Sequence, residues 1–181
     1  ACGKHFPGHG DTDKDSHIDL PTVSRGGPEL EELELAPFRA AVEAGIDALM
    51  TAHVTFPSLD STPGLPATLS QPILTGLLRE EMGFDGVIFT DSMAMHAVAT
   101  RFGVGEAAVM SVEAGADIVL ACGPFENHLK SVEALLEAVQ SGRLSEERID
   151  ASLERIFALK TRYLRSPQLE PGYPMMEHHQ S

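Results

Sequence analysis

Apolar residues alternate between two patterns along the chain. Short runs rich in β-branched and aliphatic residues are each followed by a polar loop and then by a stretch of helical periodicity. The expected strands are residues 1–6, 46–54, 86–90 and 117–121. The expected helices are residues 37–44, 70–82, 105–114, 126–141 and 146–164, the last one with Ser145 as its N-cap. Strands that alternate with helices are typical of parallel βαβ units.

Three of the expected strands share one type of entry, in the segments AGIDALM, MGFDGVIF and AGADIVL. In each segment a glycine (Gly45, Gly83 or Gly115) stands just past the end of an expected helix, where a glycine C-cap is favoured. The first loop carries no G-x-G-x-x-G pattern, so a dinucleotide site is not indicated there.

The resulting fold class is α/β, of the (β/α)8 TIM-barrel type. Four βα units make half of such a barrel, whose usual size is about 250 residues. We therefore expect residues 1–165 to form the C-terminal half of a larger barrel domain and residues 166–181 to be a flexible tail. A lone half would leave two open parallel edges, so the N-terminal half of the same barrel is the expected partner.

The composition of the chain excludes some classes of binding partner. The chain has 181 residues, of which 43% are hydrophobic, and its formal net charge is −14. Its apolar content is sufficient for a packed core, and the acidic balance argues against nucleic acid and anionic membrane surfaces as partners. No apolar run reaches the roughly 20 residues of a membrane helix, and no signal-peptide pattern opens the sequence.

Two cysteines, Cys2 and Cys122, lie in apolar, strand-like contexts, where a buried free thiol is usual. They fall on the first and fourth expected strands. Three strand steps of about 4.8 Å separate them, beyond the roughly 7 Å Cα limit of a disulfide, so we expect both to be reduced. Reduced thiols favour a cytoplasmic location.

Residues 4–21 hold an unusual density of polar chemistry: His5, His9 and His17 with Asp11, Asp13, Asp15 and Asp19. A solvated acidic loop and a metal site are the two simple interpretations. The segment that starts at Asp11 imitates a calcium loop, but Ser16 stands where glycine is needed and Thr22 where the bidentate glutamate is needed. His5 and His9 flank a Pro-Gly loop rather than lying on one helix face, which disfavours zinc. We expect neither a metal nor a cofactor.

Asp15 and His17 offer a more specific interpretation of this loop. A carboxylate two residues from an imidazole can fix its tautomer and raise its basicity. Because imidazole titrates near neutrality, such a pair can donate a proton and then withdraw one. The D-x-H spacing on its own is common.

Asp91 follows an uninterrupted apolar run and closes the third expected strand. In a barrel the carboxyl ends of the strands face the active site, so a carboxylate there is catalytic or binds substrate. An aspartate in this position can equally serve as the N-cap of the following helix. The position alone leaves both interpretations open.

The two segments together are similar to a known family. KHFPGHGDT-x-x-DSH-x-x-LP, followed by GFDGVIFTDSMAM, resembles glycoside hydrolase family 3, and within it the β-N-acetylglucosaminidases of the NagZ type. The similarity runs from Lys4 to about Arg165. It corresponds to strands five to eight of the family's barrel.

The resemblance implies a role for each matching residue. Asp91 matches the nucleophile, His17 the general acid/base, and Asp15 its partner in the His–Asp dyad. Lys4 and His5 match residues that hydrogen-bond sugar hydroxyls, and Met95 matches a residue that lines the pocket. Ser92 departs from the family, which usually has a second acidic residue there. This difference leaves the nucleophile in place and bears on its local field.

The activity so implied is that of a retaining exo-β-N-acetylhexosaminidase acting on peptidoglycan- or chitin-derived saccharides. The alternatives are another family 3 glycosidase of the β-glucosidase type, or a half-barrel fragment that is inactive without its N-terminal half. The D-S-H loop favours the first. For His9 and His53 a structural role is favoured over a place in the pocket.

Overall fold

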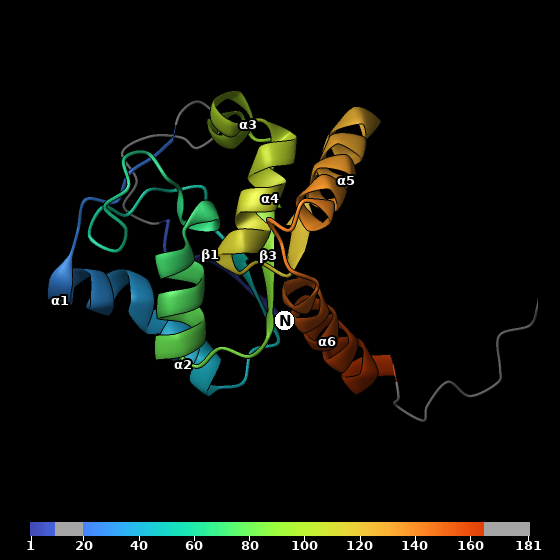
Figure 1. The fold of residues 1–181 in the computed structure, drawn as a ribbon. Coiled ribbons are helices and arrows are strands. Elements are labelled where there is room, and N and C mark those ends of the chain that lie inside the picture. Colours follow the sequence, from blue (N-terminus) through green and yellow to red (C-terminus); the bar gives the residue numbers. More distant parts are fainter. Residues whose placement is uncertain (10–19, 165–181) are drawn as a thin grey trace, which may run out of the picture.

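The computed structural model describes residues 1–9 and 20–164 and shows one parallel sheet with helices packed against it (Figure 1). The four strands run in the order β1-β2-β3-β4, and each adjacent pair is parallel. Their bounds are β1 (Cys2–Phe6), β2 (Ala48–Thr51), β3 (Val87–Ser92) and β4 (Ile118–Leu120). The predicted α/β class is confirmed. Asp15, His17 and the predicted tail 166–181 lie outside the described residues.

Helices connect the strands at the predicted places. Their bounds are α1 (Gly27–Leu30), η1 (Glu31–Leu35), α2 (Ala36–Glu43), η2 (Ala67–Leu69), η3 (Pro72–Glu81), α3 (His96–Phe102), α4 (Val104–Ala114), α5 (Phe125–Gln140) and α6 (Glu146–Leu164). The sequence pattern missed α1, η1, η2 and α3. Two of them, η2 and α3, have three and seven residues, and such lengths give helical periodicity little room to register. The other two, α1 and η1, run directly into α2, so the predicted helix 37–44 covers only the last part of a helical run from residue 27 to 43.

Helix ends follow the local chemistry that the sequence indicates. Gly45, Gly83 and Gly115 have φ values of +74°, +68° and +127°. L-residues rarely adopt this left-handed region, so glycine there lets the chain leave a helix and enter the next strand. At the start of α6, the Ser145 hydroxyl accepts the N–H of Arg148 at 3.2 Å, as an N-cap does.

The two faces of the sheet differ in burial. Leu49 and Ile88 are register neighbours on β2 and β3, both are fully buried, and they share one core cluster with Leu78 of η3. On the other face the register pair Met50 and Phe89 is only partly buried, whereas Ala48 and Val87, at the amino ends of the same strands, are buried outside that cluster. The core therefore lies on the face of the sheet that carries the connecting helices.

The prediction of two free thiols is confirmed, but the prediction that they are buried is wrong. Both Cys2 and Cys122 are free and exposed. Cys2 opens β1, an edge strand of the sheet, and Cys122 lies in the turn between β4 and α5. An apolar sequence context indicates burial only where both neighbours of a strand are present.

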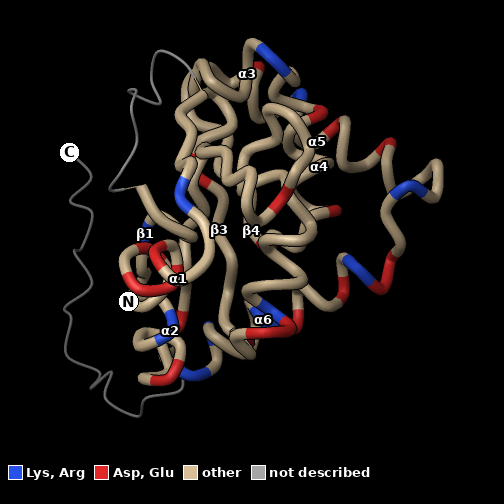
Figure 2. Tube along the Cα trace, turned by 90° about the vertical axis from the view of Figure 1, so that its left-hand side faces the viewer, with Lys and Arg blue, Asp and Glu red and all other residues tan. Residues whose placement is uncertain are grey.

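Charged residues lie along the helices and loops that surround the sheet (Figure 2). Acidic positions gather around α1, and both signs occur along α6. Among the described residues, no helix is long and apolar enough to cross a membrane.

Asp117 differs from these surface charges because its side chain lies in the interior. The Asp117 side chain, just before β4, is fully buried. Its Oδ2 accepts bonds from Arg79 of η3 at 2.5 Å and from the Ile88 backbone at 2.9 Å. Its Oδ1 accepts bonds from Ser152 at 2.8 Å and Arg155 at 3.2 Å, both on α6. This single carboxylate therefore joins η3, β3 and α6 at the amino end of the sheet.

We expect Asp117→Asn to lower the free energy of unfolding by about 3–5 kcal/mol, because it leaves the largely buried Arg79 guanidinium without its counter-charge. Urea unfolding of the two proteins measures the difference. Glu106→Gln is the matched control, since Glu106 pairs with Arg143 at the surface and such pairs contribute at most about 1 kcal/mol. Equal losses in the two variants would show that Asp117 does not hold the sheet to α6.

Candidate active site

The parallel strands bring candidate residues from three strands to one edge of the sheet. His5 lies near the end of β1, His53 follows β2, and Asp91 is the next-to-last residue of β3. His5 Nε2 and Asp91 Oδ2 are 3.6 Å apart. The backbones of β1 and β3 flank β2, so these two side chains meet across the end of that strand. The carboxyl ends of β1, β2 and β3 therefore bring these three residues to the same end of the sheet.

The two oxygens of the Asp91 carboxylate have different neighbours. Its Oδ1 accepts the N–H of Ser92 at 2.7 Å, and Oδ2 faces His5. The carboxylate keeps one quarter of its surface exposed. The alternative role as a helix N-cap is wrong, because α3 begins at His96 and its N-cap is Met95.

Burial governs the charge of His5. Burial lowers the pKa of the imidazole, and the nearby Asp91 carboxylate opposes that shift by raising the pKa. The Lys4 charge also lowers it. The net direction is downward, so the ring is neutral at pH 7. A neutral imidazole next to a carboxylate can exchange hydrogen bonds with a sugar hydroxyl without forming a permanent ion pair.

The other residues that were predicted to bind the ligand, Lys4 and Met95, differ in their exposure. Lys4 is exposed on β1, and Met95 is half-buried at the start of α3. Ser92 fills the position at which the sequence departs from the family. Its hydroxyl accepts the N–H of Ala94 at 3.3 Å, and its carbonyl accepts the N–H of Met95 at 3.0 Å. Ser92 therefore closes the turn that follows Asp91.

His53 has more contacts than the sequence indicated. It is 1% exposed, and its two ring nitrogens lie 2.9 Å from Ser92 O and 2.9 Å from Thr68 Oγ1. The favoured structural role agrees with this burial. No local motif announces these contacts, because Thr68 and Ser92 are distant from His53 in the sequence.

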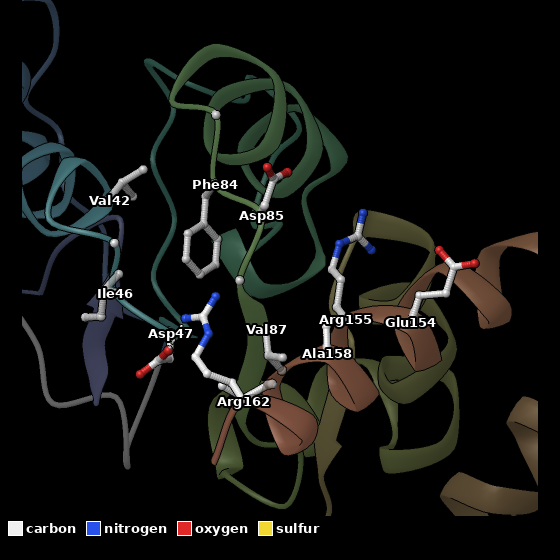
Figure 3. Close-up of a pocket in the computed structure, with 14 residues that line it drawn as sticks. Val42, Ile46, Asp47, Phe84, Asp85, Val87, Glu154, Arg155, Ala158 and Arg162 are labelled. Carbon is white, nitrogen blue, oxygen red and sulfur yellow. Dashed lines mark hydrogen bonds and ion pairs between the residues drawn. The ribbon is translucent and has the colours of Figure 1, made fainter. Parts of the chain in front are cut away.

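A cavity of about 500 Å³ lies away from these residues, at the amino ends of the strands (Figure 3). Its lining includes Phe84, Val87 and side chains of α6. In Figure 3, Arg162 lies beside Asp47, and the two are joined at 2.8 Å. Chemistry in βα-barrel proteins is carried by the carboxyl ends of the strands, so this cavity is a feature of how α6 packs.

Metal ligation has little support within residues 1–9 and 20–164. No group of three or more His, Cys, Asp or Glu side chains there is placed to hold a metal ion. The other candidate ligands of the polar loop lie outside the described residues: Asp11, Asp13, Asp15, His17 and Asp19.

Four sequential parallel strands alternate with helices in an α/β domain, and a carboxylate and two histidines lie at the carboxyl ends of its strands. Residues 1–159 match the N-terminal domain of glycosyl hydrolase family 3, and the chain belongs to this family.

Similar proteins agree with this assignment. A glycoside hydrolase family 3 β-N-acetylglucosaminidase from Paenibacillus sp. FPU-7 superposes with a TM-score of 0.89 and 52% identity, over 95% of this chain and 33% of that one. A β-hexosaminidase of Neisseria meningitidis serogroup C is 47% identical over 67% of this chain and 33% of its own length. β-Hexosaminidase A of Pseudoalteromonas piscicida is 35% identical over 90% of this chain and 30% of its own length. The chain thus spans about a third of the curated relatives it matches.

We expect Asp91→Asn to lower the pKa of His5 further, because the substitution removes the negative charge that raises it. An NMR titration of the imidazole resonances measures this change. His128 on α5 is the reference, since the substitution does not affect that helix. A rise in the pKa of His5 would contradict the proximity of the two side chains.

Proposed function

We propose that this chain carries the nucleophile of a retaining exo-β-N-acetylhexosaminidase. The observation that carries the proposal is Asp91 at the carboxyl end of β3, with one oxygen fixed by Ser92 and the other facing a neutral His5. Relatives named β-hexosaminidase and β-N-acetylglucosaminidase support the choice of substrate. The bond cleaved is the glycosidic bond of a terminal N-acetylglucosamine.

The reaction divides into two displacements at the anomeric carbon. In the first, Asp91 Oδ2 attacks that carbon, the bond to the leaving oxygen breaks, and His17 donates a proton to this oxygen. In the second, His17 removes a proton from water, the water oxygen attacks the same carbon, and the Asp91 carboxylate leaves. Asp15 stabilises the imidazolium of His17, the form that donates the proton in the first step and is regenerated in the second.

The remaining assigned residues bind the sugar. His5, being neutral and 29% exposed, hydrogen-bonds a sugar hydroxyl beside the nucleophile. Lys4 binds a second hydroxyl, and Met95 forms part of the apolar wall. Peptidoglycan- or chitin-derived saccharides are the proposed substrates. A β-glucosidase is the competing assignment, and the D-S-H sequence at 15–17 argues against it.

The proposed partner of the chain is the N-terminal half of the same barrel, with residues 1–165 as strands five to eight. The four strands follow one another without a reversal of order, as a barrel requires. Met50 and Phe89 point to the less covered face of the sheet. The free thiols support a cytoplasmic location.

In the complete protein we expect Asp91→Ala to abolish hydrolysis of every substrate, since no glycosyl-enzyme can form. p-Nitrophenyl N-acetylglucosaminide and p-nitrophenyl glucoside, assayed side by side, separate the two sugar specificities. Preference for the glucoside would overturn the hexosaminidase assignment. Activity retained in Asp91→Ala would overturn the assignment of the nucleophile.

For His17→Ala we expect a large loss of activity on an unactivated chitobiose-type substrate, because its leaving group needs a proton. The loss of glycosylation rate on activated phenolates is small. Deglycosylation stays slow, so the covalent intermediate accumulates, and azide restores turnover. Asp15→Asn gives a smaller loss in the same direction. Full activity of His17→Ala on the unactivated substrate would refute its role.

A further inference from the structure

The strands β2 and β3 differ in where they end. Their backbone pairing runs from Ala48–Val87 to Met50–Phe89, and β2 ends at Thr51. Strand β3 continues through Asp91 to Ser92. The carbonyl of Ser92 thus lies beyond the last paired residue of β2, whose backbone supplies it with no donor. The N–H of Met95, within the same turn, donates to this carbonyl at 3.0 Å, and the side facing β2 is left to a side chain.

The side chain of His53 supplies that donor. Its Nε2 lies 2.9 Å from Ser92 O, and its ring is 1% exposed. Because a carbonyl oxygen can only accept, Nε2 must carry the proton of this bond. The histidine therefore extends the hydrogen bonding between β2 and β3 past the end of β2.

The rest of the network leaves this bond in place in either charge state of the ring. Burial lowers the pKa of His53, so the neutral form prevails. In the neutral form the Thr68 hydroxyl, 2.9 Å from Nδ1, donates to Nδ1. If the ring is protonated, the same hydroxyl turns to Ala52 O, which also lies 2.9 Å away. The Nε2–H bond to Ser92 is unchanged in both forms.

The peptide unit after Ser92 is consequently held from both neighbouring strands. Its carbonyl accepts from His53, on the β2 side, and its N–H, that of Met93, donates to Leu120 O of β4 at 2.8 Å. The same residue, Ser92, donates its own N–H to Asp91 Oδ1. A shift of Ser92 would therefore carry the Asp91 carboxylate with it.

We propose that His53 is a positioning residue for Asp91. It acts through the Ser92 backbone and does not touch the substrate, since it is buried behind the turn. The inference rests on the proposed function of Asp91 as the nucleophile. A displacement of about 1 Å at a reacting group can cost roughly a hundredfold in rate, which is the size of effect to be expected.

The test uses the complete protein and three variants. Glutamine at position 53 keeps a donor near the place of Nε2, whereas asparagine places its donor near Nδ1, too short to reach Ser92. Leucine removes the donor altogether. Thr68→Val is the matched control, because it removes the partner of Nδ1 and leaves the bond to Ser92 intact.

The probe is a 5-fluoro-N-acetylglucosaminyl fluoride, which forms a slowly hydrolysed covalent adduct with the nucleophile. We expect labelling to be roughly a hundredfold slower in His53→Asn and His53→Leu, and within about tenfold of the wild type in His53→Gln and Thr68→Val. The Kd of N-acetylglucosamine and the pH profile of His53→Gln stay as in the wild type. Circular dichroism shows which variants fold.

Two outcomes separate the two proposals. Peptide mapping that finds the label on a residue other than Asp91 would overturn the proposed function itself. A label on Asp91, with asparagine and glutamine at position 53 reacting at equal rates, would overturn the role of His53 alone. The comparison of these two polar variants decides this even if His53→Leu does not fold.

Discussion

Parallel hydrogen bonding between consecutive strands is the constraint from which the rest of the structure follows. Each strand enters the sheet in the same direction, so every connection must cross back over the sheet as a helix. The carboxyl ends of all strands therefore meet at one edge. This brings His5, His53 and Asp91 together although long segments separate them in the sequence, and it requires no contact between their loops.

The amino and carboxyl ends of the strands carry different kinds of carboxylate. At the amino end, Asp117 is completely enclosed by donors from Arg79, Arg155 and Ser152, and its charge is compensated in the interior. At the carboxyl end, the Asp91 side chain keeps a quarter of its surface exposed, and its Oδ2 faces His5. A buried carboxylate at one end of the sheet and an accessible one at the other end separate the residues that hold the fold from the residues of the candidate site, as is typical of barrels.

The sequence was sufficient for what depends on local pattern. The approximate positions of the strands, the helix-capping glycines and the place of Asp91 near the end of β3 all follow from neighbouring residues. The exposure of Cys2 and Cys122 could not be predicted from their neighbours in the sequence, because burial of a strand depends on which other strands pair with it. The contacts of His53 were hidden for a similar reason, since Thr68 and Ser92 reach it only through the fold. The roles assigned to Asp15 and His17 rest on the sequence alone, since both lie outside the described residues.

The histidines around Asp91 also bear on its proposed role as the nucleophile. A protonated imidazole 3.6 Å away would hold the carboxylate in an ion pair and lower its nucleophilicity. Burial lowers the pKa of both His5 and His53, which leaves their rings uncharged at neutral pH. The carboxylate then faces hydrogen-bonding groups but no fixed positive counter-charge in the part of the chain that the structure describes. In the proposed reaction, its negative charge would then be available to the positive charge that develops at the anomeric carbon.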